Sequence, residues 1–187
     1  MRESRRDGFT LTELMIVIAI MAIVAAIGFS LDGWEDRTMA ESQVKKVYAD
    51  LMNAREQAVT RKRWFYVIFA DNPNNNNLYG YNIYTDNDDN GTYEGPPADP
   101  RVGPSWNLNG RTRMWIFRNG LLGQPQDFQL DISPEGVLID DSTGAALAGL
   151  PVYMQSPSPP QLNCLSLSAT DISLGIWNAT NNACNAN

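Results

Sequence analysis

The sequence predicts an α+β protein in which one long N-terminal helix packs on an antiparallel β-sheet. Two observations predict this class. The chain opens with a helical stretch whose first half is almost wholly apolar, and whose second half places apolar residues three and four positions apart among charged ones. Later, short β-branched and aromatic runs alternate with Gly, Pro, Asn and Asp. A helix followed only by antiparallel strands favours a sheet laid on that helix.

The apolar half of the helix runs from Leu14 to Leu31. Ser30 is the only clearly polar side chain in this stretch of the sequence. About 18 apolar residues in a helix are enough to span the hydrocarbon core of a bilayer. Residues 1–8 are short and net basic, which predicts that they stay on the cytoplasmic side. We therefore expect residues 9–31 to form a transmembrane segment and the rest of the chain to lie outside the cytoplasm.

The junction between the basic head and the apolar run reads Gly8-Phe9-Thr10-Leu11-Thr12-Glu13. This order, a Gly, then Phe-Thr-Leu-x-Glu, then an unbroken apolar helix, resembles the class III signal of type IV pilins and type II secretion pseudopilins. The resemblance implies that residues 1–8 are a leader, that a prepilin peptidase cuts after Gly8, and that the new amino terminus on Phe9 is methylated. It also implies that inner-membrane assembly machinery adds the subunit to a filament of other pilin subunits.

Glu13 is unusual because it is an ionisable residue directly before the apolar run. An ionised side chain placed toward hydrocarbon costs on the order of 2.5–3.5 kcal/mol, so it needs a partner or a function. The resemblance implies that Glu13 pairs with the terminal amine of a neighbouring subunit. Such a pair fixes the register between the two subunits, because in any other register the carboxylate would be buried without a partner at a cost in free energy. The alternative is an ordinary signal anchor whose Glu13 reaches up to the lipid headgroups.

Length, charge and cysteine content limit what the rest of the chain can be. The protein has 187 residues and a net charge of −7, which leaves one domain of about 130–150 residues beyond the helix and disfavours extensive phosphate binding. Its two cysteines, Cys164 and Cys184, lie in the half predicted to be outside, where disulfides persist. A bond between them closes a loop of about 20 residues, which contributes roughly 3 kcal/mol. Two free thiols are the alternative.

Beyond the apolar run we expect the helix to continue over residues 32–63. Gly28 and Gly33 are the expected positions of a bend, since each weakens a helix by about 1 kcal/mol relative to Ala. The basic run Arg61–Arg63 suits the negative end of the helix dipole and predicts the helix end. The apolar stripe that should face the sheet consists of Val44, Val47, Tyr48, Leu51, Ala54 and Ala58.

Residues 64–187 form the predicted globular β-sheet domain. Residues 86–104 should be a long polar loop, 156–160 a stiff Ser-Pro connector, and Asn178–Asn187 an Asn-rich tail fastened by a cysteine. The predicted strands are Trp64–Phe69, Leu78–Thr85, Thr112–Phe117, Asp127–Ile132, Gly136–Ile139, Leu150–Met154, Leu162–Ser168 and Ile172–Trp177.

Three segments narrow the resemblance within the pilin superfamily. The helix ends in Ala54-Arg55-x-x-Ala58, and a strand ends in Tyr84-Thr85-Asp86 before an acidic Asn/Gly loop. Phe128–Val137, which reads Ser-Pro-Glu-Gly-Val at 133–137, has the pattern of a strand-Gly-strand hairpin. Together they resemble the GspH/FimT-type minor pilins and pseudopilins. The resemblance implies a structural subunit that faces the periplasm before assembly and becomes part of a periplasmic or extracellular filament afterwards.

The acidic loop carries a candidate calcium site. Asp86, Asp88 and Asn90 place oxygens at alternate positions, Gly91 takes the sixth position and Glu94 the ninth. Alternating oxygen ligands converge on a hard cation when a Gly permits the sharp turn, although the bidentate Glu at the twelfth position is absent. The alternative is a solvated loop of Asx turns, which Asn and Asp favour without any metal.

One basic-aromatic cluster also stands out. Residues 110–113 read Gly-Arg-Thr-Arg, a pattern associated with DNA-binding FimT-type pilins, and Arg118 and Trp115 follow. The position is mid-chain instead of C-terminal, and a strand with outward Arg and inward aromatic side chains explains the cluster equally. We therefore do not expect nucleic-acid binding.

An enzyme is not expected. The sequence contains no His, and it lacks a nucleophile–His set, a phosphate-binding Gly loop and a dinucleotide fingerprint. The expected function is a structural minor pilin or pseudopilin. The alternatives are a major subunit of an unusual pilus, or a binding module displayed on a pilus for adhesion or DNA uptake.

Overall fold

The computed structural model consists of two compact units, Met1–Glu35 and Asp36–Asn187, which are described separately. The structure describes residues 10–28, 32–71, 79–103, 106–108, 112–118, 121–123, 128–158 and 160–186.

The first unit contains α1 (Leu11–Gly28), whose sequence is apolar after its first turn. The large apolar side chains that the structure describes on this helix are between 45% and 76% exposed. Among the described residues, no helix combines the length and apolar character required to cross a membrane. The last three residues of the predicted span Leu14–Leu31 lie outside the described residues, as do Gly8 and Phe9.

The second helix, α2 (Asp32–Arg61), is amphipathic. Gly28 is the last residue of α1, whereas Gly33 lies inside the first turn of α2. The helix stops at the predicted basic run, where Lys62 adopts a left-handed conformation with φ of 56°. Of the predicted stripe, Tyr48 is partly buried and the other five residues are at most 2% exposed: Val44, Val47, Leu51, Ala54 and Ala58.

The strands that the structure describes in the second unit pair antiparallel, and they form two sheets of six strands each. The prediction of an α+β protein with a helix packed on antiparallel strands is confirmed, but the expectation of one sheet is wrong. The first sheet has the order β3-β2-β1-β6-β7-β8, with β1 Phe65–Asp71, β2 Tyr79–Thr85, β3 Trp106–Asn107, β6 Phe128–Ile132, β7 Leu138–Asp140 and β8 Ala145–Ala146. The second has the order β12-β11-β10-β9-β4-β5, with β4 Arg113–Arg118, β5 Leu121–Gly123, β9 Leu150–Gln155, β10 Cys164–Leu167, β11 Ile172–Asn178 and β12 Ala183–Ala186.

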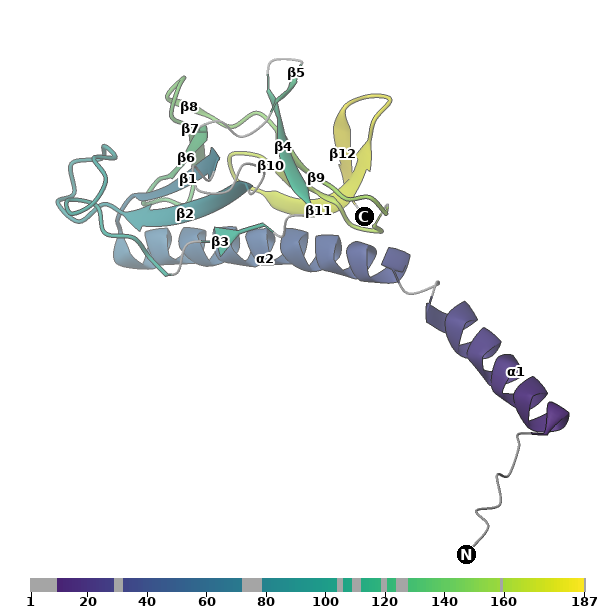
Figure 1. Cartoon of the computed structure of the whole chain (residues 1–187). Coiled ribbons are helices and arrows are strands. Elements are labelled where there is room, and N and C mark those ends of the chain that lie inside the picture. Colours follow the sequence, from purple (N-terminus) through teal and green to yellow (C-terminus); the bar gives the residue numbers. More distant parts are fainter. Residues whose placement is uncertain are drawn as a thin grey trace, which may run out of the picture. The chain divides into compact units, whose positions relative to one another are not determined.

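The core lies between α2 and both sheets, and α2 runs along one side of them (Figure 1). Alternate residues of each strand point to it, because successive side chains of a strand face opposite ways. From the first sheet, β1 contributes Phe65, Val67 and Phe69, all fully buried. From the second, β9 contributes Val152 and Met154. One helix therefore closes two sheets over a shared core.

Two predicted irregular segments differ from expectation. The C-terminal tail is not loose: β12 pairs with β11 in the register Trp177↔Cys184 and extends the second sheet by one strand. The polar loop after β2 returns to the first sheet, since Tyr84 and Arg101 form an isolated antiparallel bridge and Val102 donates an N–H to the carbonyl of Ile83 at 2.7 Å. Both segments are held by backbone hydrogen bonds, which composition does not reveal.

Candidate functional site

Thr10 caps the N-terminus of α1. Its Oγ1 accepts a hydrogen bond from the backbone N–H of Glu13 at 3.3 Å, and its carbonyl accepts from Glu13 and Leu14 at 3.1 and 3.2 Å. The spacing Thr-x-x-Glu is that of a capping box, a signal that the sequence analysis missed. Glu13 therefore lies in the first turn, where the helix dipole favours a negative side chain.

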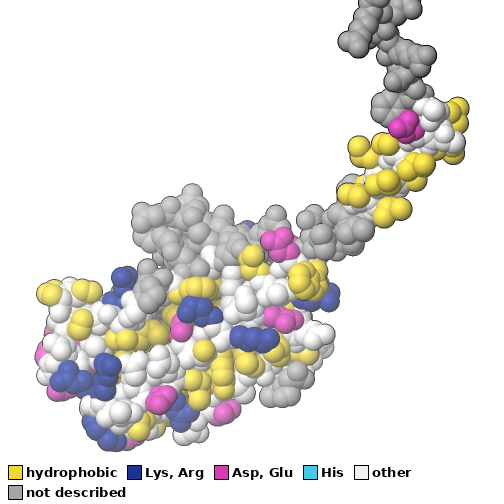
Figure 2. Space-filling view, turned by 90° about the horizontal axis from the view of Figure 1, so that it is seen from below, with side chains coloured by type: hydrophobic (Ala, Val, Ile, Leu, Met, Phe, Trp, Pro, Cys, Tyr) yellow, Lys and Arg dark blue, Asp and Glu magenta, His cyan; other side chains and the backbone are white. Residues whose placement is uncertain are grey.

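The described surface of α1 is apolar apart from its first turn. Glu13 is the acidic residue of that turn, and no basic residue lies in the last turn. Figure 2 shows hydrophobic side chains along the described part of this helix and one acidic group at its end. An apolar surface that extends around a helix is typical of one covered by lipid or by other helices.

The acidic loop is built around Asp86, which follows β2 and is fully buried. Its Oδ1 accepts the N–H of Asp89 at 2.7 Å, and its Oδ2 accepts the N–H of Gly91 at 2.8 Å and the hydroxyl of Tyr66 at 3.3 Å. Burial raises the pKa of Asp86, but the loop donors, led by Gly91, outweigh burial and hold that pKa below its usual value. Asp86 therefore organises the loop as a carboxylate.

Asp99 lies in the same loop and is also fully buried. Its Oδ2 accepts the N–H of Glu94 at 2.6 Å, whereas its Oδ1 has no hydrogen-bond partner within the described part of the chain. Carboxylate oxygens of Asp86, Asp88 and Asp99 all lie within 4.8 Å of one another. The loop thus gathers three acids, of which two are buried.

This group differs from the predicted calcium set. Asp86 and Asp88 belong to both, but Glu94 is outside the gathered group and exposed, and its backbone contributes only a donor to Asp99. Asn90 uses its amide locally: Nδ2 donates to Asp88 Oδ2 at 2.9 Å, and Oδ1 accepts the N–H of Thr92 at 2.7 Å. Asp99 was missed because the loop must fold back to bring it near the other two.

Aromatic rings hold this loop on the face of the first sheet that points away from α2. Tyr66 alternates with the core residues of β1 yet is fully buried, because Tyr93 of the loop packs on it with ring centroids 5.6 Å apart. Tyr93 also packs on Tyr84, at 5.0 Å. Burial, followed by the hydrogen bond and charge of Tyr84 and the charge of Asp99, raises the pKa of Tyr93 to about 12. The loop is therefore a packed layer over the sheet.

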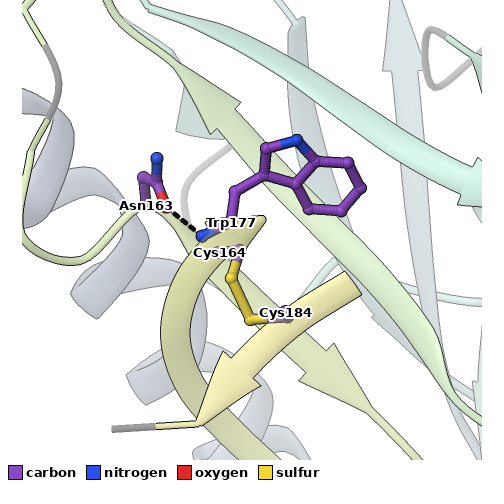
Figure 3. The surroundings of a disulfide bond; sticks show 4 residues. All are labelled: Asn163, Cys164, Trp177 and Cys184. Atoms are coloured by element: carbon purple, nitrogen blue, oxygen red, sulfur yellow. Dashed lines mark hydrogen bonds between the residues drawn. A yellow bond between two sulfur atoms is a disulfide. The ribbon is translucent and has the colours of Figure 1, made fainter. Parts of the chain in front are cut away.

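A disulfide joins Cys164 of β10 to Cys184 of β12 (Figure 3). Beside it, the side-chain oxygen of Asn163 accepts the backbone N–H of Trp177 at 2.7 Å. A side chain at Gly175 would collide with the Asn185 carbonyl and lie 2.9 Å from the Cys184 sulfur. The absence of a side chain at Gly175 therefore lets β12 approach closely enough for the bond.

The basic-aromatic cluster does not form one patch in the described residues. Arg118 pairs with Asp140 at 2.7 Å, and Trp115 donates its indole N–H to Gln155 at 2.9 Å. Arg113 is exposed, and Arg111 lies outside the described residues. Along β4, Met114 and Ile116 are buried, and alternation places Trp115 and Phe117 on the other face together with exposed Arg113, whereas Arg118 lies on the side of the buried residues. The alternative of a strand with outward Arg and inward aromatic side chains is therefore wrong for the aromatic residues and for Arg118.

Comparison with known proteins gave one match. Residues 4–29 match the model of the prokaryotic N-terminal methylation motif. Neither a search of curated proteins nor a search of solved structures found a match. The matched segment covers the predicted cleavage junction, Glu13 and all of α1. The match supports a type IV pilin-like prepilin, the class of protein that a prepilin peptidase processes.

Proposed function

We propose that the protein is a structural subunit of a type IV pilus or type II secretion pseudopilus. A prepilin peptidase cuts the chain after Gly8 and methylates the new amino terminus on Phe9. The subunit then joins a filament through α1. The observation that carries the proposal is the methylation motif at residues 4–29, which coincides with an apolar helix that has one acid in its first turn.

The chemistry of this segment explains why cutting comes before assembly. Removal of the leader creates an α-ammonium on Phe9, four residues before Glu13. A carboxylate in an apolar surrounding is tolerated when a cation pairs with it, so Glu13 of one subunit binds the ammonium of its neighbour. Before assembly the inner membrane covers α1; afterwards the α1 helices of neighbouring subunits cover one another.

We further propose a minor subunit of the GspH/FimT type. Support comes from how two of the resembling segments meet. Ala54 and Ala58 are buried beneath the sheet, and Arg55 between them donates its Nε–H to the carbonyl of Gly136 at 2.8 Å. Gly136 belongs to the turn of the strand-Gly-strand hairpin and adopts a φ of +80°. The helix-end segment and the hairpin segment thus form one structural unit.

Mass spectrometry of the protein from sheared filaments tests the proposal. The expected mass is that of a chain beginning at a methylated Phe9. A Gly8→Asp variant, which alters the residue before the cut, should keep its leader and remain in the membrane fraction. An intact leader on filament protein would contradict the proposal. Quantification of the same fraction tests the finer role, because trace amounts support a minor subunit and bulk amounts contradict it.

A further inference from the structure

We propose that the loop between β2 and β3 binds one divalent cation, of the calcium class, through the carboxylates of Asp86, Asp88 and Asp99. The proposal does not depend on filament assembly. It rests on the convergence of three acids within 4.8 Å and on the unpartnered oxygen of a fully buried one.

Within the part of the chain that the structure describes, no ion pair balances the charges at this place. In the described residues, no Lys or Arg forms an ion pair with any of the three acids. Arg63, a basic residue beside the loop, contacts Asp89 instead, with Nε 3.3 Å from Oδ1. Burying carboxylates close together without a counter-charge is costly, and a bound cation removes that cost.

Asp99 supplies the second, independent observation. Its side chain is fully buried, one oxygen accepts an N–H, and the other oxygen has no donor among the described residues. Buried polar atoms in native proteins are nearly always satisfied, so an exception calls for an explanation, and an ion is one. Asp86 also keeps acceptor capacity, because its Oδ1 accepts one N–H and a carboxylate oxygen can accept two.

Asp88, the exposed member of the group, gives a cation access from solvent.

The donor set selects the kind of cation. Carboxylate oxygens suit hard cations, whereas zinc and copper sites use His or Cys, and this chain has no His and holds both cysteines in a disulfide. Calcium tolerates irregular geometry with six to eight oxygens, while magnesium requires near-octahedral ligands. Three acids on an irregular loop therefore favour calcium, with water and backbone carbonyls completing the shell.

The cation would fasten the loop to the sheet. Asp86 lies at the end of β2, and Asp99 lies just before the segment that returns to Tyr84. A shared ion between these two carboxylates closes the loop over Tyr66 and Tyr93. Its removal should loosen the loop while leaving the α2 core intact.

The test uses the full chain in detergent micelles, stripped with a chelator. Terbium replaces calcium as a luminescent probe, and Trp64 can sensitise it because its indole lies against the loop, 3.5 Å from where a Cβ on Gly91 would stand. We expect terbium luminescence that calcium displaces at lower concentration than magnesium. Calcium at about 100 times its Kd should also raise the Tm by roughly 5–10 °C.

Three variants locate the site. Asp99→Asn should abolish both signals, and Asp88→Asn should weaken calcium binding at least tenfold; the latter residue is exposed, so its variant keeps the fold. Glu94→Gln is the matched control and should bind normally, since Glu94 lies outside the gathered group. Absence of calcium-dependent luminescence and Tm change in the unmodified chain would overturn the proposal. Loss of binding in Glu94→Gln with retention in Asp88→Asn would overturn this set of ligands.

Discussion

The two helices of this chain use apolar residues in opposite ways. In α2 the apolar residues form one stripe that is buried against two sheets, and Val44, Val47 and Leu51 are fully buried. In α1 they extend around the helix and are exposed, as at Ile16 and Ile18, each 60% exposed. In Figure 2 the described part of α1 is largely covered by apolar side chains, whereas the visible face of the second unit mixes both charges with apolar groups.

The contrast indicates which interactions stabilise each helix. An amphipathic helix obtains most of its stability from packing within its own domain. A helix with an apolar surface all round obtains it from lipid or from other chains. We therefore expect substitutions in α2 to change folding, and substitutions in α1 to change membrane association and assembly.

The prediction with the greatest change in stability compares a truncation in α2 with one in α1. Leu51→Ala should lower the free energy of unfolding of the second unit by about 2–5 kcal/mol, because it leaves a cavity in the core. Ile18→Ala, a comparable truncation in α1, should leave that value unchanged. Urea unfolding of both full-length variants in detergent, followed by tryptophan fluorescence, measures this. Equal losses in the two variants would show that α1 also belongs to the folded core.

The next effect concerns the disulfide, which constrains the second unit alone. Its cysteines are 20 residues apart, so reduction should cost roughly 3 kcal/mol through the entropy of the unfolded chain. The measurement is the Tm with and without dithiothreitol. The double variant Cys164→Ala, Cys184→Ala is the control and should not respond to the reductant. If the Tm of the unmodified protein is the same with and without dithiothreitol, this expectation is contradicted.

The smallest effect depends on pH. Burial, and then the charges of Asp141 and Asp140, raise the pKa of Asp131 to about 6 despite a hydrogen bond from Gln129. Because the folded state holds this proton more tightly than the unfolded state, the protonated acid stabilises the fold at low pH. This contribution is complete below about pH 4 and is lost as the pH rises through 6.

Asp131→Asn should therefore stabilise the second unit at pH 7 by on the order of 1 kcal/mol, a value discounted for solvent screening. The gain should shrink as the pH falls from 6 to 4. Unfolding curves at several pH values measure it, with exposed Asp171→Asn as the matched control. A constant loss of stability at every pH would instead mean that the Asp131 carboxylate is needed for packing.

Local patterns predicted most of the secondary structure. The stripe on α2 was visible because three- and four-residue spacing is local. The β1–β2 pair was visible because aromatic and β-branched runs stand on either side of an Asn-rich segment, of which residues 72–78 lie outside the described residues. The short strands β3, β5, β8 and β12 were missed, since two to four residues carry no periodicity. Alternation along a strand indicates its buried face, but it does not identify the sheet to which the strand belongs.

Long-range contacts set the limit on predicting the site. Glu13 and the methylation junction form a continuous motif and could be identified from sequence. The pairing of β4 with β9 joins Arg113 to Gln155, and nothing local indicates it. In the same way, Asp99 meets Asp86 only because Tyr93 packs on the outer face of the sheet and turns the loop back. Spacing alone therefore favoured Glu94, which the fold leaves exposed.

The most direct test of α1 as an assembly element is a Glu13→Gln substitution scored by two readouts, one in cells and one on the purified protein. We expect incorporation into sheared filaments to fall at least tenfold while the Tm of the purified variant stays unchanged. Glu35→Gln, an exposed acid on α2 that loses the same charge, should assemble normally. Normal incorporation of the Glu13→Gln subunit would contradict the account.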